Sequence, residues 1–192
     1  MLDKDMAIRL GRPPIINDDD VDIPLPERGD YFESTGTEGD KLDAFYHHVM
    51  LSRIESKIYE DLYSVRSQRG TVGNRLRAIA RLDKELQEWR DDLPPTLRPD
   101  QPLSCTPDQT AQVIMLHFVY YNCMTTIHRS PAHCALWTMG SSTRPGIDRL
   151  DNETHHRLYT SQLHCINAAR GTAHLLDYLV EQDRLPQDVL IR

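Results

Sequence analysis

Short motifs that mark enzymes are missing from this chain. It contains no glycine-flanked serine, no phosphate-binding loop and no glycine run of the dinucleotide-binding kind. A nucleophile needs a base within reach and donors for the developing oxyanion, and no residue set in the sequence supplies them. We therefore expect that the chain is not an enzyme.

An excess of positive charge is also missing. The sequence has 22 Lys and Arg against 29 Asp and Glu, a formal net charge of -7. This balance disfavours sequence-independent binding to the phosphates of nucleic acids. The N-terminal residues carry no apolar run of the signal-peptide kind, and no stretch is long and apolar enough for a confident membrane span. We expect no membrane contact.

Closely spaced cysteine pairs are absent. The four cysteines stand at positions 105, 123, 134 and 165, which favours reduced thiols in an intracellular protein. The densest group of potential metal ligands is His128, His133 and Cys134. Three ligands without a second cluster make a weak zinc pattern. We therefore predict no metal and no other cofactor in this chain.

The most apolar stretch of the chain predicts its central helix, over residues 107–129. Thr106, Pro107 and Gln109 have the pattern of a helix start, with a hydroxyl cap, a proline in the first turn and a capping-box glutamine. Apolar residues then occupy nearly the whole circumference. In a water-soluble fold such a helix must be surrounded by other helices.

Apolar residues at steps of three and four predict four further helices, over residues 1–10, 41–68, 74–92 and 153–182. Gly11 is placed to end the first helix in a left-handed conformation, and Asn74 to cap the third. Residues 17–40 read as an acidic loop and residues 94–107 as a proline-rich linker. No segment alternates like a strand, so the sequence predicts an all-α fold, an irregular bundle of about five helices.

Two of these helices carry more specific expectations. Leu2, Met6 and Leu10 share one face of the first helix, which suggests that further sequence precedes it. Arg9 and Arg12 are expected to pair with the aspartates of residues 18–22. On the last helix we expect a buried line of Leu158, Cys165, Ala169, Thr172, Leu176 and Leu179, with Gly171 allowing close approach of a neighbour.

Three separated blocks of the sequence together resemble one family. They are Ile8–Pro14 with Asp20–Pro26, then Trp89-Arg90 with Leu93–Pro99, and finally Leu116-His117, Tyr120-Tyr121-Asn122 and Ile127-His128-Arg129. In this order and spacing they are similar to the fungal-specific transcription factor domain. This is the regulatory, or middle homology, region of fungal zinc-cluster activators, including the xylanolytic type. Ser130 departs from the family pattern, which commonly has proline there.

The positions that match the family motifs are expected to be structural. They are Arg9, Gly11, Arg12, Pro13, Asp22, Pro24, Trp89, Arg90, Pro94, Pro95, His117, Tyr120, Tyr121, Asn122, His128 and Arg129.

The resemblance implies part of a larger all-helical regulatory domain, in a nuclear protein that controls transcription by RNA polymerase II. Members of the family join this domain to a six-cysteine zinc cluster that contacts DNA. The cysteine spacing here cannot form that cluster. Zinc and DNA contacts are therefore expected only in a zinc-cluster domain, which is absent from this chain. We expect the chain itself to be the C-terminal part of the regulatory domain.

The leading functional hypothesis is regulation through contacts with an effector, a co-regulator, another transcription-factor subunit or another part of the same protein. A first alternative is an all-helical enzyme or small-ligand-binding protein, with a pocket near His117, Tyr121 and His128. A second is an interaction fragment that dimerises with a full-length factor and inhibits it. A homodimer is a further expected state.

Overall fold

The computed structural model describes residues 2–28, 43–103, 105, 107–129 and 152–181. Within these ranges the chain is helical and has no strand, so the all-α prediction is confirmed. The helices are α1 (Leu2–Leu10), α2 (Ala44–Ile58), α3 (Val65–Gln68), α4 (Val72–Asp92), α5 (Pro107–His128) and α7 (Asn152–Glu181). None of the described helices is both long and apolar enough to cross a bilayer.

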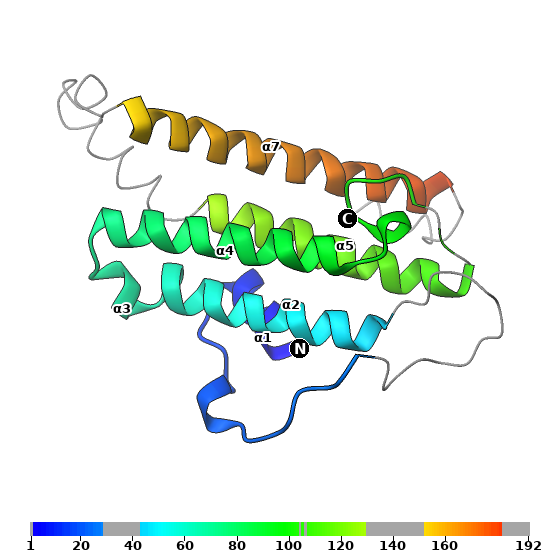
Figure 1. Cartoon of the computed structure of the whole chain (residues 1–192), viewed down its shortest axis with the longest axis horizontal. Helices are drawn as coiled ribbons and strands as arrows, with labels where there is room; N and C mark the ends of the chain where they lie inside the picture. Colours follow the sequence, from blue (N-terminus) through cyan, green and yellow to red (C-terminus); the bar gives the residue numbers. More distant parts are fainter. Residues whose placement is uncertain (1, 29–42, 104, 106, 130–151, 182–192) are drawn as a thin grey trace.

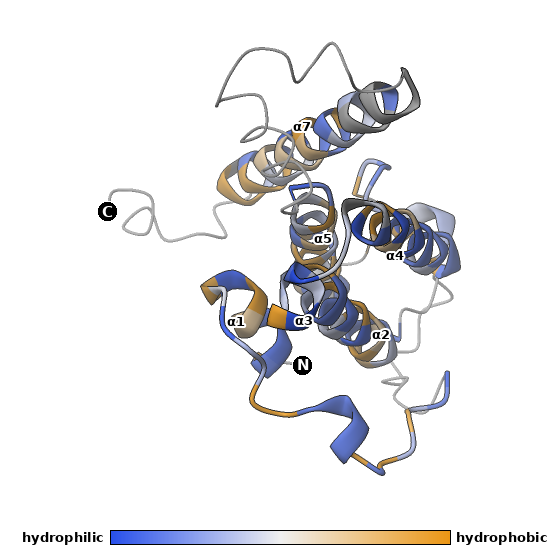
Figure 2. Cartoon of the chain, turned by 90° about the vertical axis from the view of Figure 1, so that its left-hand side faces the viewer, coloured by the Kyte–Doolittle hydropathy of each residue, from blue (hydrophilic) through white to orange (hydrophobic). Residues whose placement is uncertain are grey.

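Helix α5 lies at the centre of the bundle, as its composition predicts. It packs against α2, α4 and α7, while α1 packs against α2 (Figures 1 and 2). The α2 and α4 helices form the predicted antiparallel pair (Figure 1). Val113, Leu116, Cys123 and Ile127 of α5 are at most 1% exposed. Their burial against three helices supplies the main hydrophobic stabilisation of the bundle.

The prediction of a single helix over residues 41–68 is wrong, because the helix is interrupted at Ser64. Asp43 caps α2 by accepting the Tyr46 N–H at 2.9 Å. After α2 the chain widens into a π-helical turn over Tyr59–Tyr63, and Ser64 then takes extended backbone angles, φ -63° and ψ 153°. The Ser64 hydroxyl caps the short α3. A serine at this point offers the backbone an alternative to the helix.

The structure differs from one predicted helix boundary and agrees with another. Helix α4 begins at Val72, where Thr71 accepts the Asn74 N–H, so Asn74 is not the cap. The predicted end of α1 is confirmed. Gly11 has a φ of 63°, and the Arg12 N–H donates to the Ala7 carbonyl at 3.0 Å. This is the bonding pattern in which glycine closes a helix.

Helix α1 faces the bundle with a different side from the one its apolar residues indicate. Leu2 and Leu10 are more than half exposed, whereas Lys4 is buried. The expected pairing of Arg9 and Arg12 with the acidic run is also wrong. Lys4 pairs with Asp18 at 2.9 Å. Arg9 pairs with Asp5, and Arg12 forms no ion pair with any residue that the structure describes.

One carboxylate of α1 binds the start of the connection between α1 and α2. Asp3 accepts the backbone N–H groups of Ile15 and Ile16, each at 3.1 Å. These bonds lower the pKa of Asp3. They also carry the following residues past α1, which brings Asp18 within reach of Lys4 instead of the arginines.

The inward line of α7 is offset from the predicted one. Ser161, Ala168 and Leu175 are its buried residues, whereas Ala169 and Leu176 face outward. Apolar residues lie on both sides of this helix, so spacing alone cannot tell which side meets α5. The Leu158 side chain lies outside the described residues.

Glu55 of α2 carries a carboxyl group that is buried in the protein interior. It is 1% exposed, and its Oε1 has no hydrogen-bond partner among the described residues. Burial, with a further contribution from Asp5, raises the pKa of Glu55 from its ordinary 4.5 to about 8. The folded protein therefore holds this carboxyl in its neutral form at pH values where the unfolded chain ionises it.

We predict that Glu55 makes the protein less stable as the pH rises from about 4.5 to about 8. In this window the folded state binds one more proton than the unfolded state, so the free energy of unfolding falls with rising pH. Glu55→Gln should remove this slope and stabilise the protein at pH 8 by a few kcal/mol, since one pKa unit is worth about 1.4 kcal/mol. Urea unfolding at pH 5, 6.5 and 8 measures this. Glu88→Gln, at an exposed site of α4, is the control, and an unchanged slope in Glu55→Gln would contradict the prediction.

Candidate functional site

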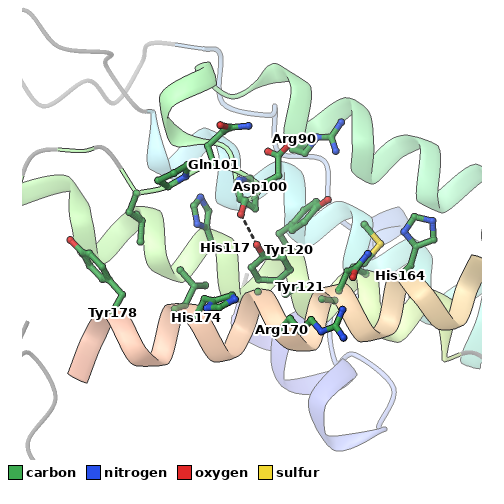
Figure 3. Close-up of a pocket in the computed structure, with 18 of the residues that line it drawn as sticks. Arg90, Asp100, Gln101, His117, Tyr120, Tyr121, His164, Arg170, His174 and Tyr178 are labelled. Atoms are coloured by element: carbon green, nitrogen blue, oxygen red, sulfur yellow. Dashed lines mark hydrogen bonds between the residues drawn. The ribbon is translucent and has the colours of Figure 1, made fainter. Parts of the chain in front are cut away.

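A large hollow lies where α5, α7 and the connection from α4 to α5 meet. It has a volume of about 990 Å³ and an apolar floor that includes Leu103, Met124 and Leu175. Several polar side chains surround that floor, namely Arg90, Asp100, His117, His164, Arg170 and His174. They come from all sides of the hollow (Figure 3). Such a cavity suits a ligand with an apolar body and a few polar groups.

The connection after α4 is held in place by the Arg98 side chain, which donates hydrogen bonds to backbone carbonyls. Arg98 donates to the carbonyls of Asp91 at 2.7 Å and Leu93 at 3.2 Å, the orphan acceptors of the α4 end. Pro95–Leu97 then forms a 3₁₀ turn with Leu97 buried. The connection is therefore anchored to α4, which fixes one wall of the cavity.

Two side chains of α5 bind the same connection from the other side. The His117 Nε2 donates to the Leu97 carbonyl at 2.8 Å, which fixes that histidine as the Nε2-protonated tautomer when neutral. The Tyr121 hydroxyl donates to the Pro99 carbonyl (Figure 3). Burial lowers the pKa of His117 and raises the pKa of Tyr121. Both groups therefore stay uncharged near neutral pH.

Aromatic rings pack against Tyr120, a residue of the cavity wall. Trp89 stacks on Tyr120 with ring centroids 5.9 Å apart, and its indole N–H donates to the His47 carbonyl at 3.1 Å. Burial raises the pKa of Tyr120 to about 12. These contacts join α2, α4 and α5 at one point, so we expect this wall to be rigid.

A second polar cluster lies deeper, next to the cavity. His128, the last residue of α5, is hydrogen-bonded through Nε2 to Asp83 of α4 and through Nδ1 to Ser161 of α7, both at 3.2 Å. The His164 ring stacks on His128 with centroids 4.5 Å apart. Burial raises the pKa of Asp83, but the hydrogen bond and charge of His128 outweigh it, so the pKa is lowered overall.

This acid–histidine–serine chain lacks the surroundings of a nucleophile. Ser161 is 9% exposed and lies inside α7, where the backbone N–H groups are already used by the helix. The α7 backbone around Ser161 therefore offers its hydroxyl no oxyanion donors. The sequence shows only a weak zinc pattern at His128, His133 and Cys134. Of these residues, His133 and Cys134 lie outside the described part of the chain.

The structure places only some of the family-motif positions at the cavity. Arg90, His117, Tyr120 and Tyr121 line it, and Trp89 stacks on Tyr120. Pro94 and Pro95 lie on the connection after α4, Asn122 lies on α5, and His128 is in the second cluster. The remaining positions do not line the cavity. They are Arg9, Gly11, Arg12, Pro13, Asp22 and Pro24 on the N-terminal segment, and the exposed Arg129 after α5.

Sequence reasoning missed several residues of these sites. Asp83, Asp100, Ser161, Arg170 and His174 carry no motif and lie among other polar residues. Their shared location arises from helix packing over long sequence separations, for example 45 residues between Asp83 and His128. One local signal does exist. Gly171 in the middle of a long helix indicates a close contact.

That contact is made with the Tyr121 ring. A Cβ atom at Gly171 would lie 2.3 Å from the Tyr121 Cζ, well inside van der Waals distance. The expected close approach of a neighbouring helix at Gly171 is therefore confirmed. The pair joins α5 to α7 at the cavity wall.

We predict that Gly171→Ala destabilises the protein by about 1–3 kcal/mol, the usual cost of overpacking, because the ring and α7 must move apart. The control is Gly73→Ala in the first turn of α4, where the nearest atom is 3.9 Å away. That change should be neutral or stabilise by up to about 1 kcal/mol through helix propensity. Urea unfolding compares the two. Equal stabilities of both variants would show that the Gly171–Tyr121 contact is not tight.

Comparison with known proteins identifies a family. Residues 1–91 match the "Fungal specific transcription factor domain". The chain is 36% identical over 191 residues to the "ABC-transporter-regulating transcription factor" of Aspergillus fumigatus, covering 95% of this chain and 21% of that protein. The same figures hold for the protein of that name from Aspergillus oryzae. The "Fusaridione A cluster transcription factor" of Fusarium heterosporum is 27% identical over 172 residues, covering 84% of this chain and 32% of that protein.

The chain thus spans about a fifth of the length of the first two relatives. No solved structure matches it. Residues 1–91 are thus similar to the fungal-specific transcription factor domain, and the two relatives that match 95% of the chain are named as fungal transcription factors.

Proposed function

We propose that this chain is part of the regulatory domain of a fungal transcription factor and acts in the nucleus. It controls transcription by binding an effector, a co-regulator or another part of the regulator, and DNA is contacted elsewhere in that protein. The observation that carries the proposal is the match of 95% of the chain to a fungal transcription factor. The alternatives of an enzyme or an inhibitory fragment are not favoured by these relatives.

The cavity is our candidate for the effector site. Four of the family-motif residues line it, namely Arg90, His117, Tyr120 and Tyr121. Its walls come from α4, α5, α7 and the anchored connection. A bound molecule would therefore contact three helices at once and could change how they pack. The polar rim and apolar floor favour a drug-sized, amphipathic molecule over a fully charged one.

A second surface favours a protein partner. Exposed apolar residues follow the outer side of α7 at helical spacing, and they are Tyr159, Leu163, Ile166, Leu176 and Val180. Figure 2 shows apolar residues along α7 and α1. Contiguous apolar surface of this kind usually mediates association. Since the chain spans about a fifth of its relatives, we propose that the rest of the regulator covers this α7 stripe.

We predict that Leu163→Lys with Ile166→Lys abolishes co-precipitation of this chain with the remainder of the regulator. The two lysines would bring charge into an apolar contact. Met115→Lys, on an exposed apolar residue of α5, is the control and should leave binding unchanged. Retained binding in the double variant would exclude the α7 stripe. A stable dimer of this chain alone by light scattering would instead favour a homodimer as the occupant.

We also predict that filling the cavity changes regulation. His174→Trp places a large ring at the rim, while His156→Trp makes the same change at an exposed α7 position outside the cavity. In the full-length regulator, His174→Trp should change output from a reporter by at least about threefold, a difference of about 0.7 kcal/mol in coupling. Because the two 36% relatives are named for ABC-transporter regulation, an ABC-transporter promoter is a suitable reporter.

The reporter comparison needs a stability control. Both tryptophan variants should melt within a few degrees of the wild type, since each replaced side chain is exposed. If both variants keep full regulation, the cavity is not an effector site. If both lose it equally, the effect comes from α7 and not from the cavity.

A further inference from the structure

Asp83, His128 and His164 bring three metal-ligating groups together from three different helices. One ligand atom of each lies within 4.8 Å of the other two. The Asp83 Oδ1 and the His128 Nε2 are already 3.2 Å apart. We propose that these residues form a binding site for a divalent transition metal of the zinc class. This site is independent of the cysteine cluster that the family resemblance implies.

The donor set argues for the class of metal. Two imidazole nitrogens and one carboxylate oxygen are ligands that zinc accepts in sites with a free fourth position. Calcium and magnesium prefer oxygen ligands, so they are disfavoured here. No thiolate takes part, because the Cys165 Sγ faces the Thr125 carbonyl instead.

The surroundings orient one ligand in the manner of built metal sites. Ser161 Oγ lies 3.2 Å from His128 Nδ1. Without metal, the Nε2–H of His128 donates to Asp83 Oδ1 at 3.2 Å. A metal ion would replace this proton between the two atoms, and the Nδ1–H would then donate to the Ser161 hydroxyl. Hydrogen bonding of the outer nitrogen is a recurrent feature of histidine ligands.

Burial and access are also suitable. The His128 side chain is 5% exposed and that of Asp83 27% exposed, which limits competition from water. His164 is half-buried and lines the cavity, so an ion can enter from that side. With metal–ligand distances near 2.0–2.1 Å, tetrahedral ligands lie about 3.3 Å apart. The three ligand atoms, now within 4.8 Å of one another, must therefore move closer, and the His164 ring must turn from its stacked position toward the other two.

A metal bound here would join the middle of α4 and the end of α5 to the middle of α7. Its fourth position would face the cavity, since His164 belongs to both sites. The ion could therefore hold a polar group of a molecule in the cavity. The metal site itself does not depend on the proposed effector function, because its ligands are all residues of this chain.

The test is titration of the full chain with Zn²⁺ alone, followed by calorimetry and by the rise in melting temperature. We expect one zinc ion per chain. His164→Ala should weaken its affinity by at least about 100-fold, because even outer-shell partners are worth roughly 10–100-fold. Ser161→Ala should weaken it by about 10-fold on the same scale. His174→Ala, on the same helix and in the same cavity, should leave the affinity unchanged.

Cobalt provides a readout that does not depend on stability. Co²⁺ bound to the wild type should give the visible absorption of a four-coordinate ion, and this band should be lost in His164→Ala and Asp83→Asn. Circular dichroism verifies that the variants fold, and His164→Ala alters only a half-buried side chain. Absence of zinc binding to the wild type, or the same affinity in wild type and His164→Ala, would overturn the proposal. The cluster would then be a hydrogen-bonded network only.

Discussion

The structure depends on the burial of most of α5 between α2, α4 and α7 (Figures 1 and 2). A helix with apolar residues around nearly its whole circumference must be largely covered by other helices. Few positions of α5, such as Met115, stay exposed. The fully buried Cys123 and Ile127 lie at the middle and end of this helix. Burial of a large apolar side chain such as Ile127 is worth about 1.5–3 kcal/mol, a sizeable fraction of the roughly 5–15 kcal/mol net stability of a typical domain.

The polar groups of the enclosed helix then determine where the cavity forms. His117 and Tyr121 cannot be left without partners in the interior, and both bind carbonyls of the connection from α4. These bonds fasten the connection to α5 at the wall of the cavity. Gly171 lets α7 approach Tyr121, which makes one of these bonds.

Local chemistry made part of this structure predictable. The cap at Gly11 and the central position of α5 follow from residue type and circumference. The break at Ser64 was not predictable from spacing, because Ile58, Leu62 and Val65 continue a helical pattern. The inward side of α7 was missed since apolar residues such as Leu163 and Leu175 occupy both sides.

The candidate sites were less predictable than the fold. Family motifs pointed to His117, Tyr121 and His128. The residues that bind these side chains come from distant segments, where the sequence does not distinguish them from ordinary polar surface residues. We propose that this chain regulates transcription and that DNA is contacted by another part of the same protein. Fusing it to an unrelated DNA-binding domain and measuring a reporter with the matching site tests that claim most directly. We predict output clearly different from that of the DNA-binding domain alone, and equal output from the two would contradict the account.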